Sequence, residues 1–508
     1  MNTIGETVMK RTAVALALAL LATPAAAQGT LRIGLSADPN MLDPAQSGSV
    51  FERVVFAALC DKLIDLDPQL RYIPQLATEW RWGDDARSLT LRLRDGVLFH
   101  DGTPMDAAAV KVNLDRYREA RESRRKTELA SVSAVEVVDP LTVRLVLSQP
   151  DAPLLAVLAD RAGMMMSPRA IAALGERIHT NPVCAGPFRF VRRVTQEVVE
   201  LERFPGYWDA GRIHLDRVEY RPIPDGTVRL LNLRAGQLDL IERVTPSDVA
   251  SVERDRSLRL IAGTAMAYQT MTFNLGAGER AKRPLGSDPR VRAALEAAID
   301  RNVINQVALE GRFVPSNQFE APDSTYWVAE RPVPPRDVAK ARALLREAGH
   351  ERVAFELAIA NAPVERQVAE VIQAMAAEAG FDISILASES ASMVAANRRG
   401  DFDAAIVIWS GRPDPDGNIA IWLQCDGFVN WGKYCNPKLD ELLGKARAVT
   451  GVEERQALYR QAAAIWMEDR PHLVLYHHRW LWASRANVEG FQAHPDGMMR
   501  LQDVRLRR

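Results

Sequence analysis

The sequence predicts an α/β protein with more than one lobe, and three observations carry this prediction. The chain has 508 residues, which exceeds the size of one ordinary domain. Residues 353–386 alternate as strand, amphipathic helix and strand, at the spacing of a right-handed parallel crossover unit. The short branched run 404–408 is typical of a buried strand and stops at a turn rich in proline and glycine.

The N-terminus predicts export. A short basic region at 9–11 precedes an apolar core at 13–21, and Ala25 to Ala27 form an A-x-A cleavage site before Gln28. The apolar core is too short to span a membrane, and no cysteine follows the cleavage point to carry a lipid anchor. We therefore expect residues 1–27 to be a signal peptide and the mature protein to be soluble and periplasmic.

Composition excludes several partner classes. The formal net charge is −1, with 47% hydrophobic and 25% charged residues. The chain has no excess of basic residues, so its charge does not indicate nucleic-acid binding. It also has no polybasic run of the kind that binds a membrane surface.

The first half of the chain contains mostly strands and turns. Alternating apolar residues mark the strands, and glycine or proline marks the turns between them. In order, we expect a strand at 31–35, strands within 76–97, a turn at 99–104 and a helix at 106–117.

The second half alternates helices with strands. Asp288 can cap, and Pro289 can open, a helix that we expect to run to about Ile304. The other expected elements are a glycine-proline turn at 182–188, a helix ending at Gly236 before a strand, strands at 268–274, 353–360 and 381–386, a helix at 363–379 and a last strand at 472–484.

The turn from Trp409 to Asn418 follows a buried strand and contains two prolines, two glycines and two aspartates. Strand ends that open into crevices are where α/β proteins bind small molecules. A loop between Cys425 and Cys435 comes next, and Asn436 with Pro437 signals a helix start. The alternative is a structural turn that contacts no ligand.

Catalytic constellations are missing from the sequence. H-E-x-x-H, G-x-S-x-G and the full phosphate-binding G-x-x-x-x-G-K-[ST] do not occur. Ser123 to Lys126 fits S-x-x-K, but its run of charges is typical of a solvated helix end. His477 and His478 are adjacent in a strand, so at most one faces a pocket. We expect no cofactor, no metal and no catalysis, with an exported hydrolase as the remote alternative.

The order of five stretches resembles the family 5 extracellular solute-binding proteins, the dipeptide and oligopeptide receptors of ABC importers. The resemblance covers essentially the whole mature chain. Its motifs are the Leu42-Asp43-Pro44 turn, the strands and turns of 76–104, the turn at 182–188, the helix end and strand at 233–240, and the C-terminal order of Trp409, Asp-Pro turn, cysteine pair, Asn-Pro helix start and 454–459.

This resemblance implies a two-lobed periplasmic-binding-protein fold of type II, similar to the large cluster C proteins, with a hinge and an inserted subdomain. The first lobe is expected to be discontinuous, comprising 28–60, 184–270 and 485–508, with 61–183 as the insertion. The second lobe is expected at 271–484. Such a receptor closes on a peptide or other small solute and passes it to membrane permease subunits, and we expect a monomer.

The cysteines of an exported chain suggest disulfides. The family has a bridge near Cys425 and Cys435, so we expect that pair, with two buried thiols as the alternative. Cys60 and Cys184 fall at the junctions of one domain in the family architecture, and whether they are bridged stays open.

The resemblance also supplies pocket candidates. For Trp409, Tyr268 and Tyr476 the alternative to ligand contact is packing in the protein core. The candidates are Trp409, Arg412, Ser410, Tyr268, Asn274, Asp414, Tyr476, His477 and Ser47.

Arg412 carries the most specific hypothesis. In the dipeptide receptors, an aspartate shortly after the tryptophan pairs with the α-ammonium of the peptide, and the matching position here is Arg412. An arginine repels an ammonium and offers a fork to a carboxylate or phosphate. Asp414 or Asp416 could still supply the acid, or Asp414 could simply neutralise Arg412. We therefore expect an anionic solute, or one without a free α-ammonium in the usual place, such as a blocked or γ-linked peptide. Glutathione, opines, metal chelates and sugar oligomers remain alternatives.

Overall fold

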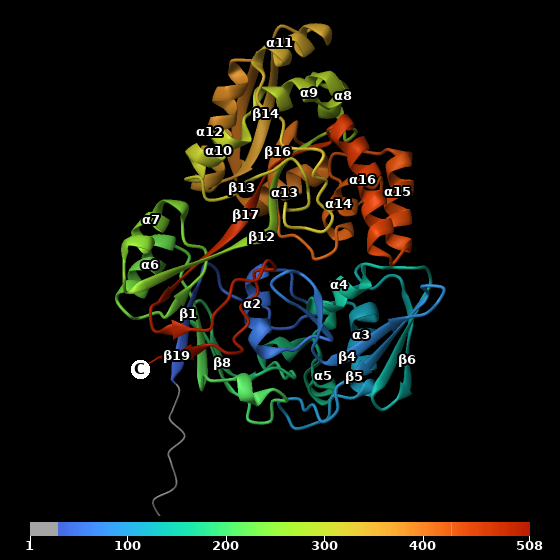
Figure 1. Cartoon of the computed structure of the whole chain (residues 1–508), viewed down its shortest axis with the longest axis vertical. Coiled ribbons are helices and arrows are strands. Elements are labelled where there is room, and N and C mark those ends of the chain that lie inside the picture. Colours follow the sequence, from blue (N-terminus) through green and yellow to red (C-terminus); the bar gives the residue numbers. More distant parts are fainter. Residues whose placement is uncertain (1–28, 428, 508) are drawn as a thin grey trace, which may run out of the picture.

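The structure, a computed structural model, describes residues 29–427 and 429–507. The expected signal peptide, residues 1–27, lies outside the described residues. Two lobes lie one above the other in Figure 1, a broad one built mainly from the first half of the chain and a narrower one built mainly from the second half. Within the described ranges, no helix combines the length and the apolar character needed to cross a membrane.

One large twisted sheet runs through both lobes. In the first lobe β1 lies parallel to β10 and β11, and in the second β14 lies parallel to β15 and β16. In spatial order its strands are β15 (Phe381–Ser388), β14 (Val353–Ala360), β16 (Ala404–Trp409), β12 (Leu258–Phe273), β17 (His472–Arg485), β11 (Leu240–Ile241), β1 (Thr30–Leu35), β10 (Arg217–Pro222), β9 (Val198–Arg203) and β8 (Phe188–Val194), with β13 (Val314–Pro315) beside β17.

The two longest strands, β12 and β17, connect the lobes. They pair antiparallel, and their register shifts between Thr264 and Tyr268. On one side of this shift the pairs belong to the first lobe, and on the other side β12 also pairs with β16 of the second lobe. The irregularity therefore lies where the sheet passes from one lobe to the other (Figure 1).

A separate four-stranded sheet covers one side of the first lobe. Its strands alternate buried and exposed residues, as expected for a sheet with one solvated face. Its order is β4 (Ala77–Trp82), β5 (Ser88–Leu93), β7 (Thr142–Leu147) and β6 (Val132–Asp139); the short pairs are β2 (Ile64–Leu66) with β3 (Tyr72–Pro74), and β18 (Val488–Glu489) with β19 (Arg505–Leu506).

Helices pack on the sheets of both lobes. Those encoded before residue 283 are α2 (Val50–Leu59), α3 (Ala107–Glu119), α4 (Leu154–Leu158), α5 (Pro168–Leu174), α6 (Gly226–Arg234) and α7 (Pro246–Arg254), with 3₁₀ turns η1 (Arg161–Gly163), η2 (Gly175–Thr180), η3 (Ala210–Arg212) and η4 (Glu279–Lys282). Those that follow are α8 (Pro284–Ser287), α9 (Pro289–Ala298), α10 (Arg301–Ala308), α11 (Val338–Glu347), α12 (Pro363–Ala377), α13 (Ser390–Arg399), α14 (Asp416–Leu423), α15 (Pro437–Ala448) and α16 (Val452–Asp469).

One helix prediction is wrong in detail, and one helix was not predicted. The helix expected from Pro289 to about Ile304 is two helices, because Asp300 adopts an extended backbone and caps α10 through Asn302 N and Val303 N. The stretch between the 409–418 turn and Cys425, for which no element is predicted, contains α14. Its glycine and asparagine residues obscure the helical pattern, although Pro415 is well placed at its start.

Both cysteine pairs are bridged. Cys425 and Cys435 form the expected disulfide, with their Cα atoms 4.4 Å apart. Cys60 and Cys184, whose bridging stayed open in the sequence, also form a disulfide, which ties the end of α2 to the segment that leads into β8.

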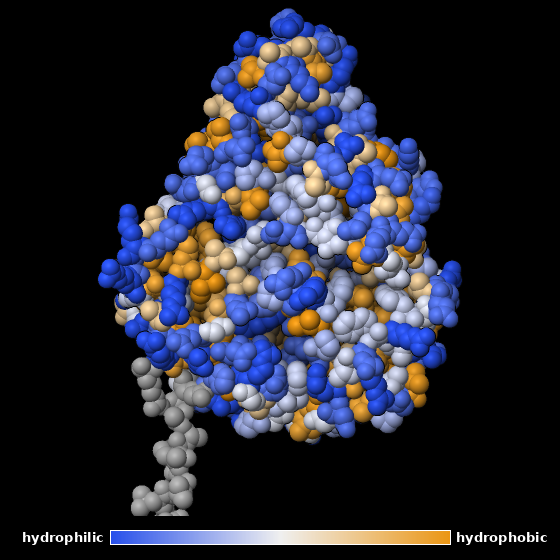
Figure 2. Space-filling model, viewed as in Figure 1, coloured by the Kyte–Doolittle hydropathy of each residue, from blue (hydrophilic) through white to orange (hydrophobic). Residues whose placement is uncertain are grey.

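Separate hydrophobic cores support the lobes. Ile33, Phe56 and Tyr220 lie in the core of the first lobe, whereas Phe355 and Ile406 lie in a core of the second. Figure 2 shows a largely hydrophilic surface with apolar side chains gathered over the region of α6 and α7. The exposed large apolar residues of α6 are Val228 and Leu231.

Candidate functional site

A pocket of about 170 Å³ lies where the two lobes meet. The first lobe contributes the turn between β2 and β3 and two residues of the C-terminal segment, Ala493 and Pro495. The second contributes the loop around Glu320 and the turn that carries Arg412 and Asn418. Residues 263–266 of β12, at the start of the register shift, complete the wall. The pocket is therefore built from both lobes and from a strand that joins them.

The 409–418 turn is held firmly against β12. Gly411 has φ +76°, and a Cβ atom at this position would lie 2.4 Å from Met266 Cβ, so only glycine fits. Asn418 closes the turn, because its Oδ1 accepts from Arg412 N at 2.7 Å and its Nδ2 donates to Arg412 O at 2.9 Å. These contacts fix the backbone from which the Arg412 side chain extends.

Arg412 lines the pocket without a charged partner. Its guanidinium donates to Ser410 Oγ at 3.0 Å and to Gly411 O at 2.7 Å, and lies 4.7 Å from the ring centre of Trp409. In the described part of the chain it forms no ion pair with a carboxylate. Desolvation lowers its pKa, and Asp160 offsets this effect only in part. The turn thus presents a cation whose charge is not neutralised by a direct contact.

Asp414 does not neutralise Arg412, so that alternative from the sequence is wrong. Both carboxylate oxygens of Asp414 accept from Arg455 at 2.7 Å, and both side chains are almost fully buried. Asp416 likewise pairs with Arg447, at 2.8 and 3.1 Å. Because both acids already have arginine partners, neither is free to replace the expected ammonium-binding aspartate.

Glu320 is a pocket residue that sequence reasoning missed. Its carboxylate accepts from Asn418 Nδ2 at 2.7 Å and from Ser324 Oγ at 2.7 Å, and its side chain is nearly buried. Desolvation raises its pKa to about 7, although both hydrogen bonds favour the charged form. It stands in a loop with no motif, so no sequence signal identifies it.

Three predicted residues meet in adjacent strands. Tyr268 of β12 lies in register with both Trp409 of β16 and His477 of β17. Tyr268 is fully buried and donates through its hydroxyl to Asn418 O at 2.7 Å, and buried His477 lies 3.0 Å from Gln318 O. Trp409 is half-buried, with its Nε1 donating to Gly417 O at 3.0 Å. The hydroxyl of Tyr268 and the Nε1 of Trp409 thus hold the backbone of the turn, and ligand contact by these three residues stays a prediction.

The remaining predicted residues are buried away from this pocket. The Asn274 amide donates to the carbonyls of Ala277, Gly400 and Phe402, and Tyr476 lies in the core of the second lobe. Ser47 is also buried and donates to Glu52 Oε2 at 2.6 Å. Ligand contact by these residues stays a prediction.

The S-x-x-K segment is only partly solvated. Ser123 donates to Tyr117 O at 2.6 Å, and Lys126 is exposed. Arg125, in contrast, is buried and donates to Ser47 O at 3.0 Å. The expectation of a wholly solvated helix end is therefore wrong at Arg125, because the loop after α3 packs against residues 45–49.

Comparison with known proteins places these features in context. The family described as bacterial extracellular solute-binding proteins, family 5, middle part, matches residues 71–430. The chain is 27% identical to the glutathione-binding protein GsiB of Escherichia coli O1:K1 over 97% of this chain and 98% of that protein. It also resembles the solved structure of the periplasmic binding protein AgaA with agropinic acid from A. tumefaciens R10, at 26% identity, with a TM-score of 0.81 over 94% of this chain and 99% of that one. The DppA protein of Helicobacter pylori with peptide STSA, at 24% identity, has the same fold, with a TM-score of 0.82 over 94% of this chain and 98% of that one.

Proposed function

Because this chain belongs to the family 5 extracellular solute-binding proteins, we propose that it captures a compact anionic peptide or peptide-like solute between its lobes. As a solute-binding receptor, it serves an ABC importer and delivers its solute to the permease subunits. The relatives named above are binding proteins, and we propose binding without catalysis here. The protein would act as a monomer.

The observation that carries the proposed solute class is the environment of Arg412. It lines the pocket, its guanidinium has no direct carboxylate partner, and the two nearby aspartates are paired with Arg455 and Arg447. A carboxylate of the solute would supply the missing charge through a forked hydrogen bond. A solute ammonium at this position would instead be repelled.

The volume of the pocket also restricts the size of the solute that it can hold. Ligand sites for drug-sized molecules typically measure about 300–1,000 Å³, whereas this pocket measures about 170 Å³. The space suits a compact solute better than an extended oligopeptide. Glutathione, a γ-linked tripeptide with two carboxylates, is one candidate; an opine-type acid is the second, supported by the likeness to AgaA.

The proposal includes export and a hinge. We propose that residues 1–27 are a signal peptide cleaved after Ala27, and that the protein works in the periplasm without a lipid anchor. The division into a first lobe (28–60, 184–270 and 485–508), an insertion (61–183) and a second lobe (271–484) is likewise a proposal. The register shift between Thr264 and Tyr268 supports a hinge close to one of these boundaries. N-terminal sequencing of the mature protein tests the cleavage, and a first residue other than Gln28 argues against it.

The solute itself can be identified directly. Protein purified from its native host is denatured, and the released small molecules are analysed by mass spectrometry. Calorimetry then compares Ala-Ala, N-acetyl-Ala-Ala and glutathione, with wild type and with Arg412→Asp. We expect wild type to prefer the acidic or amine-blocked solutes and the variant to shift toward free amines. If wild type binds only Ala-Ala and Arg412→Asp does not reverse that preference, the proposed solute class is wrong.

A further inference from the structure

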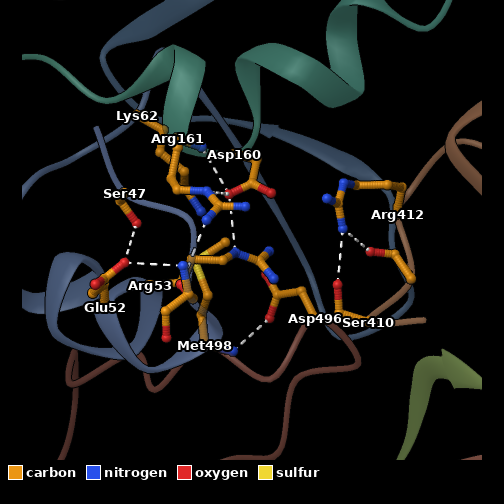
Figure 3. Close-up of polar contacts among 12 residues, drawn as sticks. Ser47, Glu52, Arg53, Lys62, Asp160, Arg161, Ser410, Arg412, Asp496 and Met498 are labelled. Atoms are coloured by element: carbon orange, nitrogen blue, oxygen red, sulfur yellow. Dashed lines mark hydrogen bonds and ion pairs between the residues drawn. The ribbon is translucent and has the colours of Figure 1, made fainter. Parts of the chain in front are cut away.

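Three buried arginines of the first lobe converge near Arg412. Arg53 comes from α2, Arg125 from the loop after α3, and Arg161 from η1, and their exposed fractions are only 2%, 4% and 5%. Figure 3 draws Arg53 and Arg161 around Asp160, with the guanidinium of Arg412 turned toward them. Segments far apart in the sequence therefore bring several cations to the place where the lobes face each other.

These arginines have few acidic partners. Arg53 Nε lies 3.0 Å from Asp160 Oδ1, and Arg161 Nε lies 3.7 Å from the same oxygen, so two guanidinium groups share one carboxylate. Arg125 pairs with Glu128 at 2.7 Å. A third carboxylate, that of Glu52, accepts from neutral donors such as the Ser47 hydroxyl and Ser49 N. Together with Arg412 there are four arginines, and they still outnumber the three carboxylates.

Arg161 is the least satisfied member of this group. Its NH1 donates to Ser49 O at 3.4 Å, and its buried Nε has no hydrogen-bond partner among the described residues. Desolvation lowers the pKa of Arg161 to about 9, and repulsion from Arg125, Arg53 and Arg412 adds to this, against the attraction of Asp160. An uncompensated buried cation is costly, so this arrangement favours a bound anion.

A neighbouring network shows what a purely structural charge cluster looks like in this protein. Lys62 and Arg500 face Asp65 and Asp496, so cations and carboxylates are equal in number. Arg500 alone donates four hydrogen bonds to the two acids. The arginines around Asp160 lack this balance, although both networks are buried in the same lobe.

We propose that Arg161 of the first lobe and Arg412 of the second lobe grip the same anionic group of the solute, a carboxylate in the simplest case. This inference rests on the proposed function and adds its mechanism of closure. Before closure Arg161 shares the single Asp160 carboxylate with Arg53, Arg412 has no direct carboxylate partner among the described residues, and the repulsion between the two arginines opposes contact of the lobes. A shared anion converts that repulsion into a bridge, so binding and closure become one event.

Sulfate is a suitable probe, because it tests the anion site without knowledge of the solute. Thermal unfolding is followed in sulfate and in chloride at equal ionic strength, for wild type, Arg161→Met, Arg412→Met and the double variant. Arg144→Met, which removes an exposed arginine from β7, is the matched control. We expect sulfate to raise the unfolding midpoint of wild type and the control by more than that of either single variant. The double variant should lose no more of this response than one single variant, because both arginines hold one ion.

Equal sulfate responses in all five proteins would overturn the inference. Arg412→Met, at a half-buried turn position, keeps the test decisive if Arg161→Met does not fold. A second measurement separates this inference from the proposed function: affinity for N-acetyl-Ala-Ala and glutathione should fall about tenfold or more in Arg161→Met. Solute binding that is unchanged in Arg161→Met leaves the receptor role intact and refutes the shared anion site. An arginine-dependent sulfate response with no binding of either solute leaves the anion site intact and counts against the proposed solute class.

Discussion

Arg412 and Asp414 lie two residues apart in one turn, yet only Asp414 has a charged partner. The Asp414–Arg455 pair is buried, bidentate and flanked by the ring of Tyr326, 5.4 Å from the guanidinium. Arg412 instead lines the pocket and bonds to its own turn. At the scale of single residues, one charge therefore stabilises the fold and the other stays available for a ligand.

This difference predicts that replacing arginine by methionine destabilises the protein much more at position 455 than at position 412. Arg455→Met leaves Asp414 buried without its partner, so we expect the free energy of unfolding to fall by about 3–5 kcal/mol. Arg412→Met leaves no directly paired carboxylate behind, so its effect on stability should be much smaller. Urea unfolding of the two variants measures both values. Equal losses would mean that Arg412 contributes to the fold as Arg455 does.

Glu320 should make stability depend on pH. Its pKa is raised from 4.5 to about 7 in the folded protein, so the folded state binds more protons than the unfolded state between these values. Stability from this residue is therefore greatest at low pH and declines as pH rises from about 4.5 to 7, by at most about 1.4 kcal/mol per unit. Glu320→Gln should remove this decline. Unfolding curves at several pH values compare the two proteins, and parallel pH profiles would contradict the assignment.

At the scale of elements, the 409–418 turn depends on its contact with β12. The turn leaves β16 beside the residues where β12 changes register, and Gly411 packs directly on Met266. Asn418, at the start of α14, bonds both to the turn and to Glu320. Strand, turn and helix therefore position Arg412 as one unit.

Gly411→Ala should disturb this unit more than an alanine at another left-handed glycine. Gly349 also has positive φ, +83°, but no atom lies within 4 Å of its missing Cβ. Gly349→Ala therefore reports backbone strain alone, whereas Gly411→Ala adds a clash that should cost about 1–3 kcal/mol more. Chemical denaturation measures the difference. We also expect only Gly411→Ala to weaken solute binding, and equal destabilisation by both would show that the turn can move away from β12.

At the scale of the whole molecule, the lobes contact each other directly. Ala152 N of the first lobe donates to Arg447 O of α15 at 2.9 Å. Nearby, burial and the Asp414 carboxylate raise the pKa of Tyr72, which stands on β3 at the opposite side of the interface. The described arrangement is therefore one in which the two lobes are in direct contact.

Closure should be visible in solution. Ligand-free protein is expected to sample wider arrangements, because the arginines on the two lobes repel each other without an anion. A saturating solute identified by mass spectrometry should reduce the radius of gyration measured by small-angle X-ray scattering. Arg412→Asp with the same solute is the control and should show a smaller change. An identical radius with and without solute would argue against hinge closure in this protein.

The sequence by itself determined the α/β class, several of the longer strands and helices, and the helix starts at Asp106, Asp288 and Asn436. These features depend on local periodicity and capping, which neighbouring residues encode directly. With the family resemblance, it also pointed to the Cys425–Cys435 bridge and to Arg412 as an unusual residue.

Only the tertiary structure decided which charges meet. Asp414 pairs with Arg455, 41 positions away, and Asp160 lies between Arg53, 107 positions earlier, and Arg161, its direct neighbour. Periodicity reports which side of an element is buried, but it does not report which distant side chain lies opposite. Buried ion pairs require both the direction and the distance of two side chains, and these are set only when the lobes and loops pack together.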